Sequence, residues 1–285
     1  MSMKFHPFSK KLECGYDKPI TTNHFARETR NLGVEPSEVL EIWCTQGNIS
    51  TIENLHLFPN LTSLRLWRNN IKVIHGLEGN QQLEQLWLGE NHIPRIENLE
   101  ELSNLQVLNL KQNRISKLEG LDNLNKLVSL SLWGNQIEKI ENLSNLSNLA
   151  NLNVSNNKIQ KLEGLGQLEN LEELSLYRNQ ITRIEGLERL KRLKKLDLSY
   201  NPIEKLEGLE ALEQLQCLIL NSTNISKLEG LEHLKELVML DINGASIAKI
   251  EGLEELDKLK RLGLAKNNIR KIEGISHLKN LEELS

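Results

Sequence analysis

A period of 22 residues, which runs without interruption through most of the chain, constrains the fold more than any other feature. Leucines recur at this spacing from Leu61 to Leu281, and one further step back reaches Val39. A unit of this length cannot bury its own leucines, so neighbouring units must stack and share one continuous core. The period therefore predicts a repetitive solenoid, in which each unit contacts only its neighbours.

Each unit follows the pattern L-x-x-L-x-L-x-x-N-x-I-x-x-I-E-G-L-x-x-L, as residues 105–124 show. The L-x-L stretch places alternate side chains on opposite faces, which predicts a short strand whose leucines point inward. Apolar residues then recur every third position, which favours 3-10 or short helical turns. We expect an α/β repeat solenoid, a right-handed superhelix with a concave parallel β-sheet and a convex side of such turns.

The repeat frame divides the chain into three segments. Residues 39–280 hold eleven complete units, residues 281–285 begin a twelfth, and residues 1–38 do not fit the pattern. A solenoid needs a terminal piece with one polar face, so residues 1–38 are predicted to be an N-terminal cap. We see no comparable cap at the other end and expect either a longer protein or another surface that covers that end.

A short helix is predicted within the cap. Thr21 and Thr22 are suited to start it, and Gly33 is suited to end it. The spacing of Phe25 and Leu32 predicts that both side chains lie on one side of this helix.

The ninth position of the repeat is Asn in eight of the eleven units. A side-chain amide can satisfy backbone groups of neighbouring turns that would otherwise be buried without partners. Gly47, Thr223 and Ala245 interrupt this series. We expect local weakness around residues 223–247.

Composition and charge exclude several function classes. The formal charge of −4, with both signs interspersed, gives no basic stripe for a nucleic acid, and no stretch is long and apolar enough to be a secretion signal or a membrane span. The three cysteines, an odd number at wide spacings, favour a reducing compartment. The dispersed histidines and the lack of a convergent acid, base or nucleophile predict no metal, no cofactor, no catalytic residues and no enzyme activity. We expect a soluble monomer in the cytoplasm or nucleus.

Aromatic residues gather at repeat positions that project from the predicted sheet. All four tryptophans fall at the fifth or seventh position, and Tyr177 and Tyr200 fall at the seventh and eighth, while Tyr16 lies in the predicted cap. Exposed aromatic side chains are frequent anchors of protein interfaces, although cross-strand stiffening of the sheet is an alternative explanation. The predicted partner-binding residues are Trp43, Arg65, Trp67, Arg68, Trp87, Lys111, Trp133, Tyr177, Arg178, Asp197, Tyr200 and Asp241.

Two patches stand out within this predicted surface. The strongest should comprise Trp43, Arg65, Trp67, Arg68 and Trp87 on three adjacent strands, and charge should become more acidic toward the C-terminal half. The second patch is purely apolar and consists of Cys217, Ile219 and Met239.

The repeat is that of leucine-rich-repeat proteins of the 22-residue class, and KLEGLDNL and KIENLSNL resemble units of the leucine-rich regulatory subunit of protein phosphatase 1. The resemblance covers residues 39–285. It implies that a phosphatase is held by acidic and aromatic residues at the fifth position. Here Trp43, Trp87, Asp197 and Asp241 match in part, while the alternating series and the closing cap of that family are missing.

These observations predict a non-enzymatic protein–protein interaction scaffold, with a type-1 phosphatase catalytic subunit as one candidate partner. Two alternatives stay open. Bacterial internalin-like adhesins also use 22-residue units, although they normally carry secretion signals. The chain could also be the recognition domain of a larger signalling protein.

Overall fold

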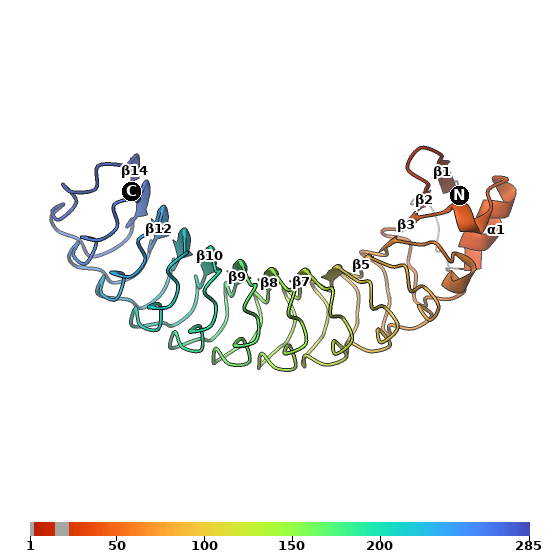
Figure 1. Ribbon diagram of the computed structural model, residues 1–285, viewed down its shortest axis with the longest axis horizontal. Helices are drawn as coiled ribbons and strands as arrows, with labels where there is room; N and C mark the ends of the chain where they lie inside the picture. Colours follow the sequence, from red (N-terminus) through yellow and green to blue (C-terminus); the bar gives the residue numbers. More distant parts are fainter. Residues whose placement is uncertain (1–2, 15–22) are drawn as a thin grey trace. The chain divides into compact units, whose positions relative to one another are not determined.

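The computed structural model describes residues 3–14 and 23–285 and divides into two compact units, residues 1–136 and 137–285. Each unit is a succession of three-residue parallel strands joined by turns, with little helix (Figure 1). The predicted parallel-sheet solenoid is therefore confirmed.

The described residues of the first unit form a hairpin, one α-helix, two 3-10 helices and five repeat strands. Strand β1 pairs antiparallel with β2, and from β2 to β7 each strand pairs parallel with the next. Its elements are β1 (Met3–His6), β2 (Lys11–Cys14), α1 (Asn23–Asn31), η1 (Pro36–Glu38), β3 (Glu41–Trp43), η2 (Leu55–Leu57), β4 (Ser63–Arg65), β5 (Gln85–Trp87), β6 (Val107–Asn109) and β7 (Ser129–Ser131).

The second unit repeats the same arrangement, with each strand parallel to the next and in register with the equivalent residue of the neighbouring repeat. Its elements are β8 (Asn151–Asn153), β9 (Glu173–Ser175), β10 (Lys195–Asp197), β11 (Cys217–Ile219), β12 (Met239–Asp241), β13 (Arg261–Gly263) and β14 (Glu283–Leu284).

Aliphatic side chains of the repeat form the core. In the unit that begins at Leu105, the side chains of Leu108, Leu110 and Ile115 are completely buried, as the alternation of the strand predicts. The intervening strand residues lie half-buried on the outer face of the sheet. The core therefore holds each strand with the same face outward, and that face carries the predicted site.

The asparagine of the ninth position links adjacent repeats through its side chain. Asn113 accepts a hydrogen bond from the backbone N–H of Ile93 at 3.0 Å and donates to the carbonyls of Leu88 and Leu110, both at 3.0 Å. Equivalent bonds recur at the other ladder asparagines, so backbone groups at the strand ends are satisfied as predicted.

At the interruptions the bonding changes. Thr223 donates only to the carbonyl of Leu220, at 2.9 Å, and Ala245 has no polar side chain. A different bond is present in this region, because the side chain of Asn221 accepts from the backbone N–H of Asn243, also at the seventh position, at 2.8 Å. The expected weakness of this region stays a prediction.

A glycine in the turn of most repeats is required by close approach to the preceding repeat. Gly230 has φ +77°, and a Cβ built there would lie 2.5 Å from the carbonyl oxygen of Leu206. Only glycine tolerates both the left-handed conformation and this contact.

The N-terminal cap differs in part from the prediction. Sequence reasoning missed the hairpin, in which β2 takes the place of a preceding repeat strand and buries Leu12 completely. Gly33 has φ +67° just beyond helix α1, as expected. Phe25 is buried, but Leu32 is 42% exposed, so its predicted position is wrong; Thr29, one turn after Phe25, is buried instead. Thr21 and Thr22 lie outside the described residues.

Candidate functional site

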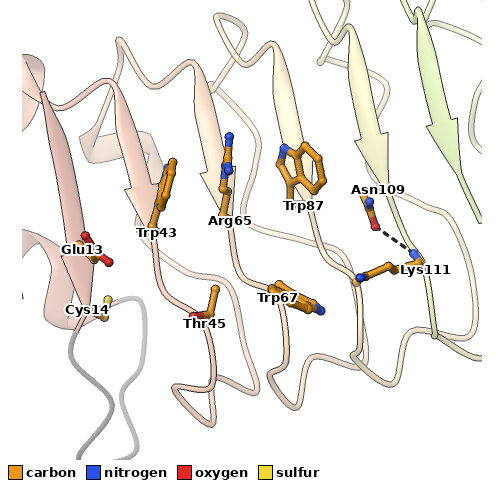
Figure 2. A pocket seen from close by; sticks show the side chains of 10 residues that line it. Glu13, Cys14, Trp43, Thr45, Arg65, Trp67, Trp87, Asn109 and Lys111 are labelled. Carbon is orange, nitrogen blue, oxygen red and sulfur yellow. Dashed lines mark hydrogen bonds between the residues drawn. The ribbon is translucent and has the colours of Figure 1, made fainter. Parts of the chain in front are cut away.

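Three neighbouring strands of the first unit place an arginine between two tryptophans. Trp43 ends β3, Arg65 ends β4 and Trp87 ends β5, and the strand register sets them side by side. The guanidinium carbon of Arg65 lies 4.1 Å from the ring centroid of Trp43 and 5.1 Å from that of Trp87 (Figure 2). Both distances are in the range of cation–π attraction.

The hairpin strand β2 adds a second cation to this row. The Nζ atom of Lys11 lies 3.8 Å from the ring centroid of Trp43 and also forms an ion pair with Glu13 at 3.0 Å. Trp43 therefore interacts with cations from both neighbouring strands, β2 and β4.

Trp67 and Lys111 meet across a glycine. Trp67 follows β4 and Lys111 follows β6, so one strand separates them, and Gly89 occupies the equivalent position on that strand. A Cβ at Gly89 would lie 2.8 Å from the Cγ atom of Lys111. Because Gly89 has no side chain, the Nζ atom of Lys111 reaches to 4.5 Å from the ring centroid of Trp67.

These side chains surround a cavity of about 350 Å³, which we call the Trp–Arg pocket. Its walls come from β2 to β6 and the residues that follow them (Figure 2). The lining residues are Glu13, Cys14, Trp43, Thr45, Arg65, Trp67, Trp87, Gly89, Asn109 and Lys111.

The Trp–Arg pocket contains buried hydrogen-bond donors that lack acceptors. Within the described part of the chain, no partner is present for the indole Nε1 atoms of Trp43, Trp67 and Trp87 or for the Nε atom of Arg65. A buried donor without an acceptor costs about 1–3 kcal/mol, so the pocket is rich in donors whose bonding is incomplete.

Cations next to the pocket differ in whether a carboxylate neutralises them. Glu90 forms ion pairs with Arg68 at 3.0 Å and with Lys111 at 3.7 Å. Arg65 has no ion pair among the residues that the structure describes, and its side-chain contact is a 3.4 Å hydrogen bond to the Oε1 atom of Gln85. Arg65 is thus a half-buried cation without a counter-charge.

The structure brings together most of the stronger predicted patch. Trp43, Arg65, Trp67 and Trp87 line the pocket, and Lys111 joins them. Arg68, Trp133 and the predicted residues of the second unit do not line it. Arg68 is exposed, because the chain turns at φ +58° after the strand, and its guanidinium carbon lies 5.7 Å from the ring centroid of Trp67. Trp133, after β7, is half-buried.

Sequence reasoning did not include Glu13, Cys14, Thr45, Gly89 and Asn109 among the site residues. Thr45, Gly89 and Asn109 occupy the same fifth or seventh positions, so the repeat frame could have identified them. Glu13 and Cys14 belong to the hairpin, which lies outside the repeat and therefore gave no positional signal.

The second unit holds the other predicted residues in different surroundings. The ring centroids of Tyr177 and Tyr200 are 5.0 Å apart in an edge-to-face arrangement. Arg178, which follows Tyr177 in the sequence, is exposed. The Asp197 carboxylate accepts a bond from the backbone N–H of Ser199 at 3.0 Å. Asp241 is only 7% exposed and pairs with Arg261 at 3.3 Å, so it contributes little free carboxylate to the surface.

No disulfide joins the cysteines in the part of the chain that the structure describes. Cys14 and Cys44 follow the paired strands β2 and β3, and burial raises the pKa of the Cys14 thiol, with a further rise from its hydrogen bond to Cys44. Burial also raises the pKa of Cys217, whose sulfur lies 3.5 Å from that of Met239. Cys217, Met239 and Ile219 are all half-buried, on two adjacent strands.

The described residues form neither a cluster of metal ligands nor a membrane-spanning helix. Among residues 3–14 and 23–285, no cluster of three or more His, Cys, Asp or Glu side chains is arranged to hold a metal ion. None of the described helices has the length and apolar character needed to cross a bilayer.

A family model of tandem leucine-rich repeats matches the chain in overlapping pairs of repeats that together span residues 59–211. This span is more than half of the chain, and it contains the stacked strands and the asparagine ladder described above. The chain is a leucine-rich repeat protein.

Several solved leucine-rich repeat structures are similar to it. An internalin, inlF, from Listeria monocytogenes is 30% identical with a TM-score of 0.82, over 87% of this chain and 74% of the internalin chain. A leucine-rich repeat protein of Leptospira interrogans is 21% identical with a TM-score of 0.64, over 91% of this chain and 78% of that one. An assembly of latrophilin 3, Unc5D and the leucine-rich repeats of FLRT2 matches at 21% identity and a TM-score of 0.74, over 89% and 83% of the two chains.

No protein of curated function matches this leucine-rich repeat chain. Repeat solenoids present extended surfaces for ligands, and the chain is a binding scaffold of this kind.

Proposed function

We propose that this leucine-rich repeat protein binds a folded protein partner on the outer face of its sheet and that the Trp–Arg pocket is the centre of the interface. The observation that supports this most is the group of three tryptophans around one cavity, with buried donors that lack acceptors. Partly buried aromatic and arginine side chains around a concave site supply most of the binding energy in protein interfaces. The flanking face, which includes Trp133 in the first unit, would add contacts around this centre.

Residues of the second unit form a further part of the proposal. Tyr177, Arg178 and Tyr200 offer an aromatic and cationic surface, and Asp197 offers a half-buried carboxylate. Their contribution can be measured separately, because each side chain lies outside the Trp–Arg pocket.

A pull-down from cell lysate tests the proposal, with wild-type chain beside the Trp67→Ala/Trp87→Ala variant and mass spectrometry as the readout. Leu57→Ala is a matched control, because Leu57 is an exposed apolar residue (42%) on the 3-10 helix η2, away from the sheet. We expect a partner retained by wild type and control and lost by the double variant. Equal partner lists for all three proteins would contradict the proposal.

The finer identity of the partner is a separate proposal. The resemblance at the fifth repeat position makes a type-1 phosphatase catalytic subunit one protein to look for, in the cytoplasm or nucleus. The similarity to the Listeria internalin favours an internalin-like adhesin as a second candidate. Protease treatment of intact cells distinguishes them. An adhesin on the cell surface is digested, whereas a phosphatase regulator inside the cell is protected.

A further inference from the structure

The chemistry of the Trp–Arg pocket also indicates what kind of residue it receives. We propose that the pocket binds the carboxylate of an Asp or Glu side chain from an acidic segment of the protein partner. This inference rests on the proposed function and adds the chemical class of the group bound.

The first argument is the environment of the Arg65 guanidinium. The rings of Trp43 and Trp87 approach it within 4.1 and 5.1 Å of their centroids. The two rings flank the guanidinium from the neighbouring strands, and its 3.4 Å hydrogen bond to Gln85 uses the Nη2 atom, so other N–H groups at the edge of this planar group can bond a ligand. A carboxylate matches such an edge with two parallel hydrogen bonds, which a neutral amide or a hydroxyl cannot do equally well.

The second argument is the excess of donors over acceptors. The Nε atom of Arg65 and three indole N–H groups are buried without acceptors in the described part of the chain. An indole N–H and a guanidinium N–H can only donate. Because these four atoms are buried, a ligand bonds them only if the side chains shift on binding. Such a ligand must bring acceptor atoms, and an ionised carboxylate is an acceptor at both oxygens.

The third argument is the local charge. The pocket lining contains two cations, Arg65 and Lys111, and one carboxylate, Glu13. Lys11 pairs with Glu13 at 3.0 Å and Glu90 pairs with Lys111 at 3.7 Å, so Arg65 is left as the lining cation without a carboxylate partner among the described residues. The chain as a whole has a formal charge of −4. The pocket is thus a positively charged region of an acidic protein. An acidic segment of the partner is attracted to it more strongly than to the rest of the protein surface.

A random-sequence peptide library displayed on phage tests the inference without knowledge of the natural partner. Wild-type chain, Arg65→Gln, Arg65→Lys and the Trp67→Ala/Trp87→Ala variant are used as bait. Arg114→Gln is the matched control, because Arg114 is exposed in the turn after β6 and its loss changes the net charge equally. Melting curves of each variant establish that the bait is folded.

We expect peptides selected by the wild type and by Arg114→Gln to share an Asp or Glu at one position, and Arg65→Gln to lose this preference. Changing that Glu to Gln in a selected peptide should weaken its binding to the wild type about tenfold or more. Arg65→Lys keeps the charge but not the planar edge, so it should bind these peptides more weakly than the wild type.

Three results would overturn the inference. If wild type selects peptides that Trp67→Ala/Trp87→Ala does not, but without an acidic residue in common, the carboxylate is wrong and the proposed function stands. If Arg65→Gln selects the same acidic peptides as wild type, or Arg65→Lys binds them as tightly as wild type, Arg65 is not the recognising group. If wild type and the double tryptophan variant select the same peptides, both the inference and the proposed function fail.

Discussion

The asparagine ladder makes a quantitative prediction for Asn113→Ala. Asn113 is 8% exposed, and its side chain accepts from the backbone N–H of Ile93 and donates to the carbonyls of Leu88 and Leu110. The two carbonyls keep a bond each, from Asn91 and Asn135, both at 3.0 Å. The N–H of Ile93 is therefore the group that loses its ladder partner.

The cost follows from this accounting. An unpaired buried N–H costs about 1–3 kcal/mol, and each bond lost from a carbonyl that remains paired costs about 0.5–1 kcal/mol. We expect Asn113→Ala to lower the free energy of unfolding by about 2–5 kcal/mol. The matched control is Asn123→Ala, because Asn123 is an exposed asparagine of the same repeat with one 3.2 Å bond to the carbonyl of Glu100. It should cost less than about 0.5 kcal/mol.

Chemical denaturation measures the free energy, and hydrogen exchange of the Ile93 amide measures the local effect. Because repeat solenoids can unfold in parts, the exchange measurement is the stricter of the two. The Ile93 amide should exchange faster in Asn113→Ala and at an unchanged rate in Asn123→Ala. An unchanged rate in both variants, with equal stabilities, would refute the assignment of the ladder as the partner of the strand ends.

Three further predictions concern stability. Ala245→Asn should restore the ladder next to Asn267, which accepts a hydrogen bond from the N–H of Ile247 at 2.9 Å. The free energy of unfolding should rise by about 1–2 kcal/mol, and an unchanged midpoint of unfolding in urea would contradict this. Gly230→Ala, at φ +77°, should destabilise by about 2 kcal/mol or more, whereas Gly166→Ala, with only a side-chain atom 3.9 Å away, should not. Because the pKa of Cys14 is raised in the folded state, its stabilising contribution is present below the unfolded pKa of about 9 and is lost as pH rises through the folded pKa. The advantage of wild type over Cys14→Ala in unfolding free energy should shrink between about pH 8 and about pH 10.

The repeat could be predicted well because one local pattern decides each unit. Leu108 and Leu110 have the same buried position as their equivalents in the other repeats, so one correct assignment places every strand. The hairpin could not be predicted in this way, because β1 and β2 occur once and their pairing with β3 depends on distant contacts. Leu32 was misplaced for a related reason, since the short helix packs through Phe25 and Thr29.

The site shows the same division. The fifth and seventh positions identified Trp43, Arg65, Trp67 and Trp87, because strand alternation dictates which face they take. Arg68 was expected to join them, but the eighth position adopts a left-handed conformation, with φ +58° at Arg68 and +56° at Arg178. That turn is occupied by many residue types, so the sequence carries no clear signal for it.

The hydrogen bonds of the ladder connect residues 20 or 25 positions apart, and the register of the strands pairs equivalent residues of adjacent repeats. When one whole 22-residue repeat is inserted or deleted, the repeats on either side of the change can therefore form the same hydrogen bonds with their new neighbours. The length of this protein can change by recombination at almost any repeat boundary of the second unit while the Trp–Arg pocket, confined to β2 to β6, keeps every neighbour it has. Under the proposed function, partner choice and chain length can therefore evolve separately.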